Sequence, residues 1–140
     1  MKIQEAVTKR LLVATLLAIA TLGLLGYLAS FIDRSGGAGP TLSPGYLDPV
    51  DLLVAAVAMC LGGYIEGKRF IGVALAIMCV IWIVTVCLLA QIASPTQPDA
   101  LHYVFVYNRA QIGLSVLAAC TGAAIGAWLR MKRALARPLS

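Results

Sequence analysis

Residues 70–93 read FIGVALAIMCVIWIVTVCLLAQIA and contain no Lys, Arg, Asp or Glu. A helix needs ~20 mostly apolar residues to cross the ~30 Å hydrocarbon core of a bilayer. Backbone groups in lipid must be satisfied within the segment, and this run lacks the polar–apolar alternation of a membrane barrel strand. The stretch therefore predicts a membrane-spanning helix at 69–93.

Three further apolar runs lie at 11–32, 50–65 and 110–131. The whole composition agrees, because 61% of the 140 residues are hydrophobic and only 12% are charged, whereas a soluble domain carries about 25% charged residues. The first run exceeds the ~7–15 apolar residues of a secretory signal, so we interpret it as a retained helix.

The fold class predicted from these runs is an all-α integral membrane protein, a bundle of four transmembrane helices forming a single domain over 1–140. The predicted helices are 11–32, 48–66, 69–93 and 109–131, with loops at 33–47 and 94–108 and a turn at 66–69. The turn is so short that we expect the two helices it joins to pack antiparallel.

Basic residues are concentrated at one side of these helices. Nine of the eleven fall before the first helix, in the turn, or after the fourth helix: Lys2, Lys9, Arg10, Lys68, Arg69, Arg130, Lys132, Arg133 and Arg137. The positive-inside rule predicts that this side is cytoplasmic. We therefore expect a bacterial inner-membrane protein with both termini in the cytoplasm. The net charge of +5 then serves topology and contact with anionic lipid, and we expect no nucleic-acid partner.

Small residues recur on one face of the second and fourth predicted helices. The predicted helix-packing residues are Ala55, Ala58, Gly62, Ser115, Ala119, Gly122 and Gly126. Such faces let helix backbones approach closely in lipid, where no hydrophobic force drives helices together. Two interpretations stay open: the two helices pack on each other within one chain, or their faces bind a second copy or another membrane protein.

The second and fourth predicted helices also resemble each other in sequence. A shift of 60 residues lays 58–65 over 118–125, with four of the eight positions identical. Two interpretations are open here as well. Either the chain contains two helical hairpins repeated in parallel about an axis along the membrane normal, or the restricted membrane alphabet produces the match by chance.

Polar residues gather near the expected outer ends of the helices. Asp48 is a good N-cap, Pro49 suits the first helical position, and Asp51 follows in the first turn. The whole predicted outer polar cluster is Asp48, Asp51, Asp99, His102, Arg109 and Gln111. We expect Asp51 to pair with Arg109 or Gln111 and so to link the two hairpins. Residues 100–108 are either a surface helix or the first turns of the fourth helix.

Residue types that carry chemistry are sparse. The four cysteines form no Cys-x-x-Cys motif, and the single histidine has too few neighbouring ligands for a zinc site. No ionisable residue falls in the central turns of any predicted helix, although ion and proton pathways normally require one. We therefore expect no catalytic, cofactor-binding or metal-binding residues and no cofactor.

These observations favour a small non-catalytic membrane protein, a subunit or accessory protein that associates through small-residue helix faces. Its expected partners are membrane lipid and either further copies of itself or another membrane protein. One alternative is a small oligomeric transporter, channel or lipid-handling protein, which would need a polar cavity lined by residues such as Thr85, Gln91, Gln111, Ser115 and Thr121. Another is a membrane enzyme built on the outer polar cluster.

Overall fold

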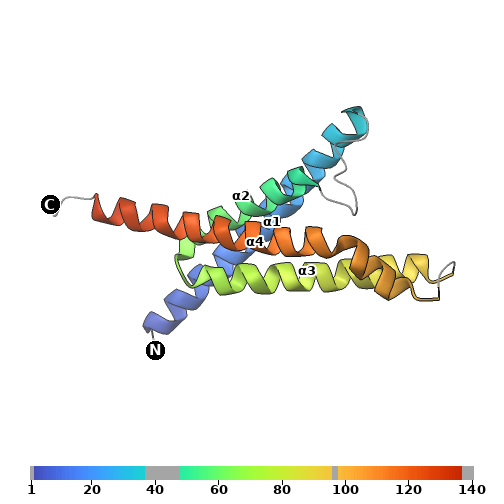
Figure 1. The fold of residues 1–140 in the computed structure, drawn as a ribbon. Coiled ribbons are helices and arrows are strands. Elements are labelled where there is room, and N and C mark those ends of the chain that lie inside the picture. Colours follow the sequence, from blue (N-terminus) through green and yellow to red (C-terminus); the bar gives the residue numbers. More distant parts are fainter. Residues whose placement is uncertain (1, 37–47, 96–97, 137–140) are drawn as a thin grey trace.

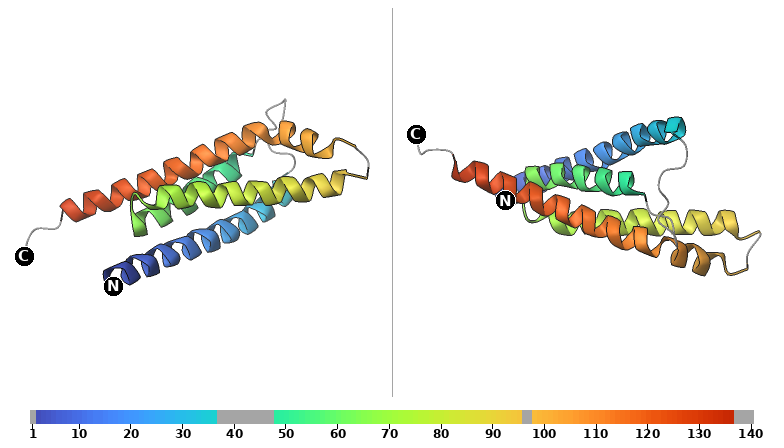
Figure 2. Two further views of the ribbon diagram at one scale, coloured as in Figure 1. Left: turned by 90° about the horizontal axis from the view of Figure 1, so that it is seen from below. Right: turned by 45° about the horizontal axis from the view of Figure 1, so that its top comes forward.

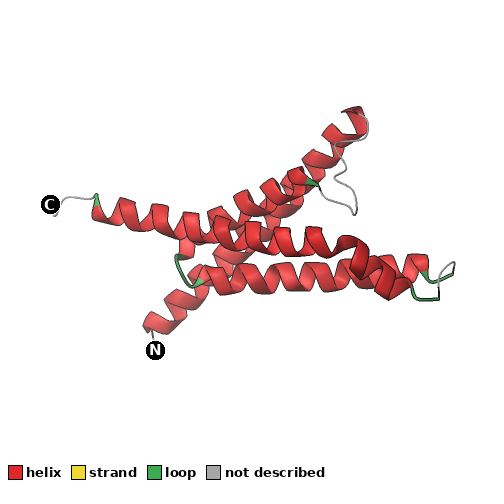
Figure 3. Cartoon of the chain, viewed as in Figure 1, coloured by secondary structure: helices red, strands yellow, loops and turns green. Residues whose placement is uncertain are grey.

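The computed structural model describes residues 2–36, 48–95 and 98–136. It contains the helices α1 (Lys2–Gly36), α2 (Pro49–Glu66), α3 (Phe70–Ala93) and α4 (Ala100–Leu135) (Figure 1). Each helix is long and apolar enough to cross a membrane. No strand occurs in the described ranges (Figure 3). The prediction of an all-helical chain with four apolar helices of membrane-spanning length is confirmed.

Two of the helices are longer than their predicted apolar cores. α1 extends to Lys2 and to Gly36, so it continues into the segment expected as a loop, the rest of which (37–47) lies outside the described residues. α4 begins at Ala100, and residues 100–108 are therefore its first turns. With 36 residues and a rise of 1.5 Å per residue, α4 is ~54 Å long, which exceeds the ~30 Å hydrocarbon core.

The start of α1 and the end of α4 lie at one end of the molecule, together with the turn between α2 and α3 (Figure 1). We call this the terminal end. The opposite end, where α2 and α4 begin and α3 finishes, is the far end. α1 and α2 separate from α3 and α4 toward the far end (Figures 1 and 2).

Contacts between helices do not follow their order along the chain. α2 packs most extensively on α4, while α1 packs on α2 and α3 packs on α4. α2 and α3 run antiparallel, as expected from their short connection, but α2 makes most of its contacts with α4 and few with α3.

Alanine forms most of the buried core. Alanines of all four helices contribute, joined by Met59, Phe70 and Met78. Large apolar side chains point outward instead; for example, Leu53 is 67% exposed and Ile83 is 63% exposed. Such an inverted distribution would be an aggregation hazard in water, and it suits a protein whose surroundings are hydrocarbon.

Local residue choices set the ends of α2. The Asp48 carboxylate accepts a hydrogen bond of 2.8 Å from the Val50 N–H, and Pro49 occupies the first helical position, which confirms the predicted cap. At the other end, Gly67 adopts φ +88° and ψ −152°, a region that only glycine occupies readily. Its N–H donates to the Gly63 carbonyl at 2.8 Å, and the chain then reverses into α3.

Candidate functional site

The predicted helix-packing residues lie buried inside one chain. Ala55, Ala58, Gly62, Ser115, Ala119, Gly122 and Gly126 are all buried. At Gly122, an added Cβ would overlap the Ala56 carbonyl, and at Gly126 it would overlap the Cys60 carbonyl. Because both glycines and both carbonyl residues are spaced four apart, one helical turn of α4 rests directly on one turn of α2. We call this contact the α2–α4 seam.

Two positions at the seam depart from the sequence expectation. At Gly62, the atoms nearest to an added Cβ belong to the ring of Phe70 at the start of α3. The adjacent residue, Gly63, is the one whose added Cβ would overlap the Ala123 carbonyl. Sequence reasoning missed Gly63 and Ala123, because helical spacing defines the packing face of a helix only to within about one residue. The 60-residue shift aligns Gly63 with Ala123, and this alignment could have identified the two residues as a contact.

Polar side chains of α4 attach it to both neighbouring helices. Gln111, only 2% exposed, accepts a hydrogen bond of 3.0 Å from the Asp48 N–H and donates one of 3.4 Å to the Asp48 carbonyl. One turn further, the Trp82 Nε1–H of α3 donates to the Ser115 hydroxyl at 2.6 Å. Ser115 in turn donates to the Ile112 carbonyl at 3.0 Å. Every buried side-chain polar atom in the described residues has a partner.

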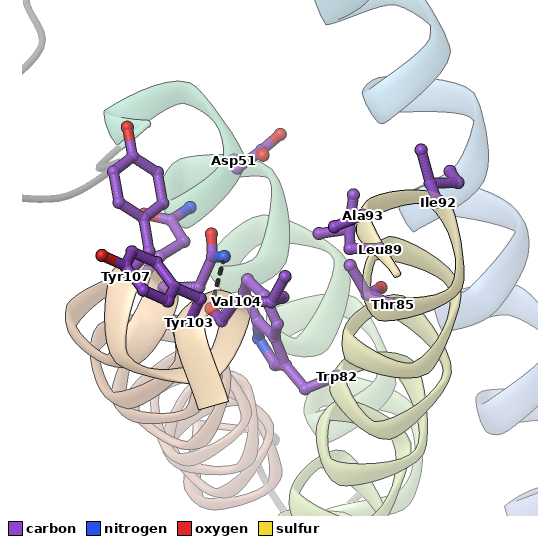
Figure 4. Close-up of a pocket in the computed structure, with 11 residues that line it drawn as sticks. Asp51, Trp82, Thr85, Leu89, Ile92, Ala93, Tyr103, Val104 and Tyr107 are labelled. Carbon is purple, nitrogen blue, oxygen red and sulfur yellow. Dashed lines mark hydrogen bonds between the residues drawn. The ribbon is translucent and has the colours of Figure 1, made fainter. Parts of the chain in front are cut away.

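A pocket of about 580 Å³ opens at the far end between α2, α3 and α4. Residues of these three helices line it: Asp51, Trp82, Thr85, Leu89, Ile92, Ala93, Tyr103, Val104, Tyr107, Asn108 and Gln111. Figure 4 shows the tyrosines on one wall, Leu89 and Ile92 on the opposite wall, Trp82 at the base and Asp51 above. We call it the far-end pocket.

The predicted outer polar cluster is only partly gathered at this pocket. Asp51 and Gln111 line it, and Asp48 adjoins it through its two bonds with Gln111. Asp99, His102 and Arg109 are not among the lining residues. Gln111 links α4 to α2 as expected of one candidate partner, but its hydrogen bonds go to the main chain of Asp48.

The cavity residues expected for transport are also divided. Thr85 and Gln111 line the far-end pocket, whereas Gln91 and Thr121 are exposed on the helix surfaces. Sequence reasoning missed Trp82, Tyr103, Tyr107 and Asn108 as lining residues. The aromatic spacing at 103 and 107, one turn apart, was visible, but which neighbour they face depends on the helix packing.

Aromatic and basic side chains are paired at the terminal end. Arg133 donates a hydrogen bond to the Tyr64 hydroxyl, and its guanidinium carbon lies 5.5 Å from the centre of that ring. The Lys132 ammonium lies 4.2 Å from the centre of the Trp128 ring. A Cβ added at Gly67 would lie 3.2 Å from Arg130 Nη1, so this guanidinium is held close to the end of α2.

In the described residues, no three His, Cys, Asp or Glu side chains come close enough together to hold a metal ion. Asp99 occupies the N-cap position of α4 without a side-chain capping bond.

No protein-family model, curated protein or solved structure matches this chain.

Proposed function

We propose that this chain is a small non-catalytic protein of the bacterial inner membrane that binds a lipid-like amphiphile, either alone or as an accessory subunit of a larger assembly. The observation that carries the proposal is the far-end pocket. Its volume of about 580 Å³ falls within the ~300–1,000 Å³ of typical small-molecule sites.

The two kinds of lining residue support an amphiphilic ligand. Leu89, Ile92 and Val104 offer an apolar surface for a hydrocarbon chain, while Asp51 and Asn108 offer polar groups for a head group. Membrane lipids combine both parts in one molecule. They are also the small molecules present at the highest concentration around helices that cross a bilayer.

The charge distribution supports an orientation for this pocket. Lys68, Arg69, Arg130, Lys132 and Arg133 all belong to the terminal end. The positive-inside rule assigns such an end to the cytoplasm. The pocket then opens in the outer half of the bilayer, with both chain termini on the inner side.

A non-catalytic role is supported by how the outer polar residues are distributed. Acid–base chemistry needs donor and acceptor groups around one reacting atom. Asp51 reaches the pocket, but Asp99, His102 and Arg109 do not line it with Asp51.

The accessory-subunit role, our second candidate, has to use a surface other than the α2–α4 seam, whose small residues are already covered. α1 offers one, since it packs mainly on α2 with Ala14 and Ala18 fully buried. Further along, an added Cβ would meet nothing within 4 Å at Gly23 or Gly26. A helix of a partner protein or of a second copy would fit against this part of α1.

One further feature of the proposal concerns the origin of the chain. Gly63 faces Ala123 across the seam, and these positions correspond under the 60-residue shift. This correspondence supports a duplication of one helical hairpin, with the second and fourth helices meeting at the axis that relates the two copies.

Filling the pocket tests the proposal. Val104→Trp places a large ring at a lining position, whereas Val106→Trp alters a lipid-exposed position of the same helix that does not line the pocket. Native mass spectrometry of the gently purified protein should show a retained phospholipid in the wild type and in Val106→Trp. We expect about tenfold weaker retention in Val104→Trp. Equal retention in the two variants would exclude a lipid-binding role for the pocket.

A further inference from the structure

We propose that the terminal end binds the phosphate of an anionic phospholipid, such as phosphatidylglycerol, in a defined site beside the turn between α2 and α3. Three cations form this site, which we call the turn site: Arg130 of α4 and Lys68 and Arg69 of the turn. The far-end pocket lies at the opposite end of the helices. Lipid binding at the turn site is therefore independent of lipid binding in that pocket.

The guanidinium of Arg130 is held against the turn. A Cβ added at Gly67 would lie 3.2 Å from Arg130 Nη1 and 3.9 Å from Arg130 Cδ, so this side chain reaches from α4 to the end of α2. Arg130 is half-buried, and no hydrogen bond, ion pair or ring contact joins it to another residue that the structure describes. An arginine fork without an acceptor is suited to bind a phosphate through two parallel hydrogen bonds.

Two further cations adjoin this guanidinium. Lys68 and Arg69 follow Gly67 directly, and both are exposed. Consecutive Cα atoms are ~3.8 Å apart, so these long side chains can reach the space beside Arg130. Glu66, the acidic residue of the turn, makes no ion pair with any of the three in the described part of the chain. The three like charges repel one another, and an anion between them replaces this repulsion with attraction.

The neighbouring cations of α4 are held by aromatic rings. Arg133 donates a hydrogen bond to the Tyr64 hydroxyl and lies beside its ring, and the Lys132 ammonium lies 4.2 Å from the centre of the Trp128 ring. Tyrosine and tryptophan settle at the head-group level of a bilayer. Arg130 follows Trp128 by two residues, a rise of ~3 Å along the helix. Its guanidinium is therefore at the depth of lipid phosphates.

Apolar side chains beside the turn site favour a phospholipid over a free phosphate. Ile125 and Leu129 are one turn apart on α4, just before Arg130, and are 54% and 41% exposed. An acyl chain can lie along them while the phosphate contacts Arg130, and a free phosphate gains nothing from this surface. Phosphatidylethanolamine has the same phosphate but adds an ammonium, which the three cations repel. Phosphatidylglycerol has no such group and is therefore favoured.

Lipid titration of the full-length, delipidated protein tests the turn site. Native mass spectrometry would be performed with phosphatidylglycerol and with phosphatidylethanolamine of identical acyl chains. We expect Arg130→Gln to bind phosphatidylglycerol about tenfold more weakly than the wild type, because charge-assisted hydrogen bonds are lost, and to bind phosphatidylethanolamine equally well. Lys68→Gln, at an exposed position of the turn, should weaken phosphatidylglycerol binding about fivefold without threatening the fold.

Two variants with the same loss of charge at the same end are the controls. Arg133→Gln and Lys132→Gln remove cations that aromatic rings hold, and each should weaken phosphatidylglycerol binding about twofold at most. Equal losses in the control and test variants would show that the whole charged end attracts anionic lipid, and would overturn the turn site. Displacement of the lipid by millimolar inorganic phosphate would also overturn it, because the site would then take a free anion.

Tryptophan fluorescence locates the bound lipid. The chain has two tryptophans: Trp82 lines the far-end pocket, and Trp128 lies next to the turn site. In Trp82→Phe, brominated phosphatidylglycerol should quench Trp128 more strongly than brominated phosphatidylethanolamine, and adding Arg130→Gln should abolish the difference. In Trp128→Phe, quenching of Trp82 should not respond to Arg130→Gln. Equal quenching of Trp128 by the two lipids would contradict the turn site and leave the proposed function of the pocket untouched.

Discussion

Gly126 has the least room of any single position at the α2–α4 seam. An added Cβ would overlap the Cys60 carbonyl and would lie 2.7 Å from the Tyr64 nitrogen, so only backbone atoms are available to move. Gly113, on the same helix, has nothing within 4 Å of an added Cβ. Gly126 is therefore required for close contact between the helices, whereas Gly113 is not, although the sequence does not distinguish the two glycines.

Alanine substitution should change stability in opposite directions at these two glycines. Gly126→Ala forces the helices apart, and overpacking of this kind costs ~1–3 kcal/mol. Gly113→Ala meets no obstacle and should be neutral or stabilising by up to ~1 kcal/mol, because alanine loses less backbone entropy in a helix. Thermal unfolding in detergent measures both. Equal midpoints for the two variants would show that the α2–α4 contact is not as close as described.

Gln111 is the buried polar residue that fastens the start of α2. Replacing it with Leu removes the hydrogen bond that Gln111 accepts from the half-buried Asp48 N–H, and the loss of one such bond costs ~0.5–1.5 kcal/mol. We expect Gln111→Leu to accelerate amide hydrogen exchange in the first turn of α2. Gln91→Leu, at an exposed position of α3, is the control and should leave that exchange unchanged. Unaltered exchange in Gln111→Leu would contradict the assigned hydrogen bonds.

At the scale of elements, hydrophobicity alone was sufficient to predict the number and type of helices. Lipid requires every spanning segment to satisfy its own backbone, so length and composition determine the helices before any packing is known. Capping was equally local, which is why Asp48 and Pro49 could be assigned from four residues of sequence. The far boundaries of α1 and α4 were underestimated, since helices continue past the apolar core that reveals them.

Packing between elements was harder to predict because small residues carry little directional information. Gly62 and Gly63 are adjacent, yet one faces Phe70 and the other faces Ala123. The lining of the far-end pocket depends on how three helices pack together. The sequence alone therefore could not identify Trp82 and Asn108 as lining residues. The sequence could place Asp51 and Gln111 near each other, because both lie close to the predicted starts of the second and fourth helices, at the same side of the membrane.

The turn between α2 and α3 depends on one backbone conformation. Gly67 occupies a region of φ and ψ that costs other residues ~1–3 kcal/mol, and an added Cβ would also approach Arg130. Gly67→Ala should therefore lower the unfolding midpoint. Gly72→Ala, where nothing lies within 4 Å of an added Cβ, should not lower it. A midpoint for Gly67→Ala equal to that of Gly72→Ala would mean that the turn tolerates another conformation.

At the scale of the whole molecule, α4 is the organising element. It contacts α2 through backbone at the seam and α3 through the Trp82–Ser115 hydrogen bond. α1 is attached mainly through α2. This arrangement produces the far-end pocket, because α1 and α2 separate from α3 and α4 toward that end (Figure 2).

Thiol labelling tests most directly whether these helices cross a bilayer with the terminal and far ends on opposite sides. In a cysteine-free variant, single cysteines would replace Asp99 at the far end, Lys68 at the terminal end and Val80, 60% exposed, within α3. With a membrane-impermeant reagent, we predict labelling of position 99 in intact spheroplasts, of position 68 only after permeabilisation, and of position 80 in neither state. Labelling of positions 68 and 99 together in intact spheroplasts, or of position 80 in either state, would contradict the account.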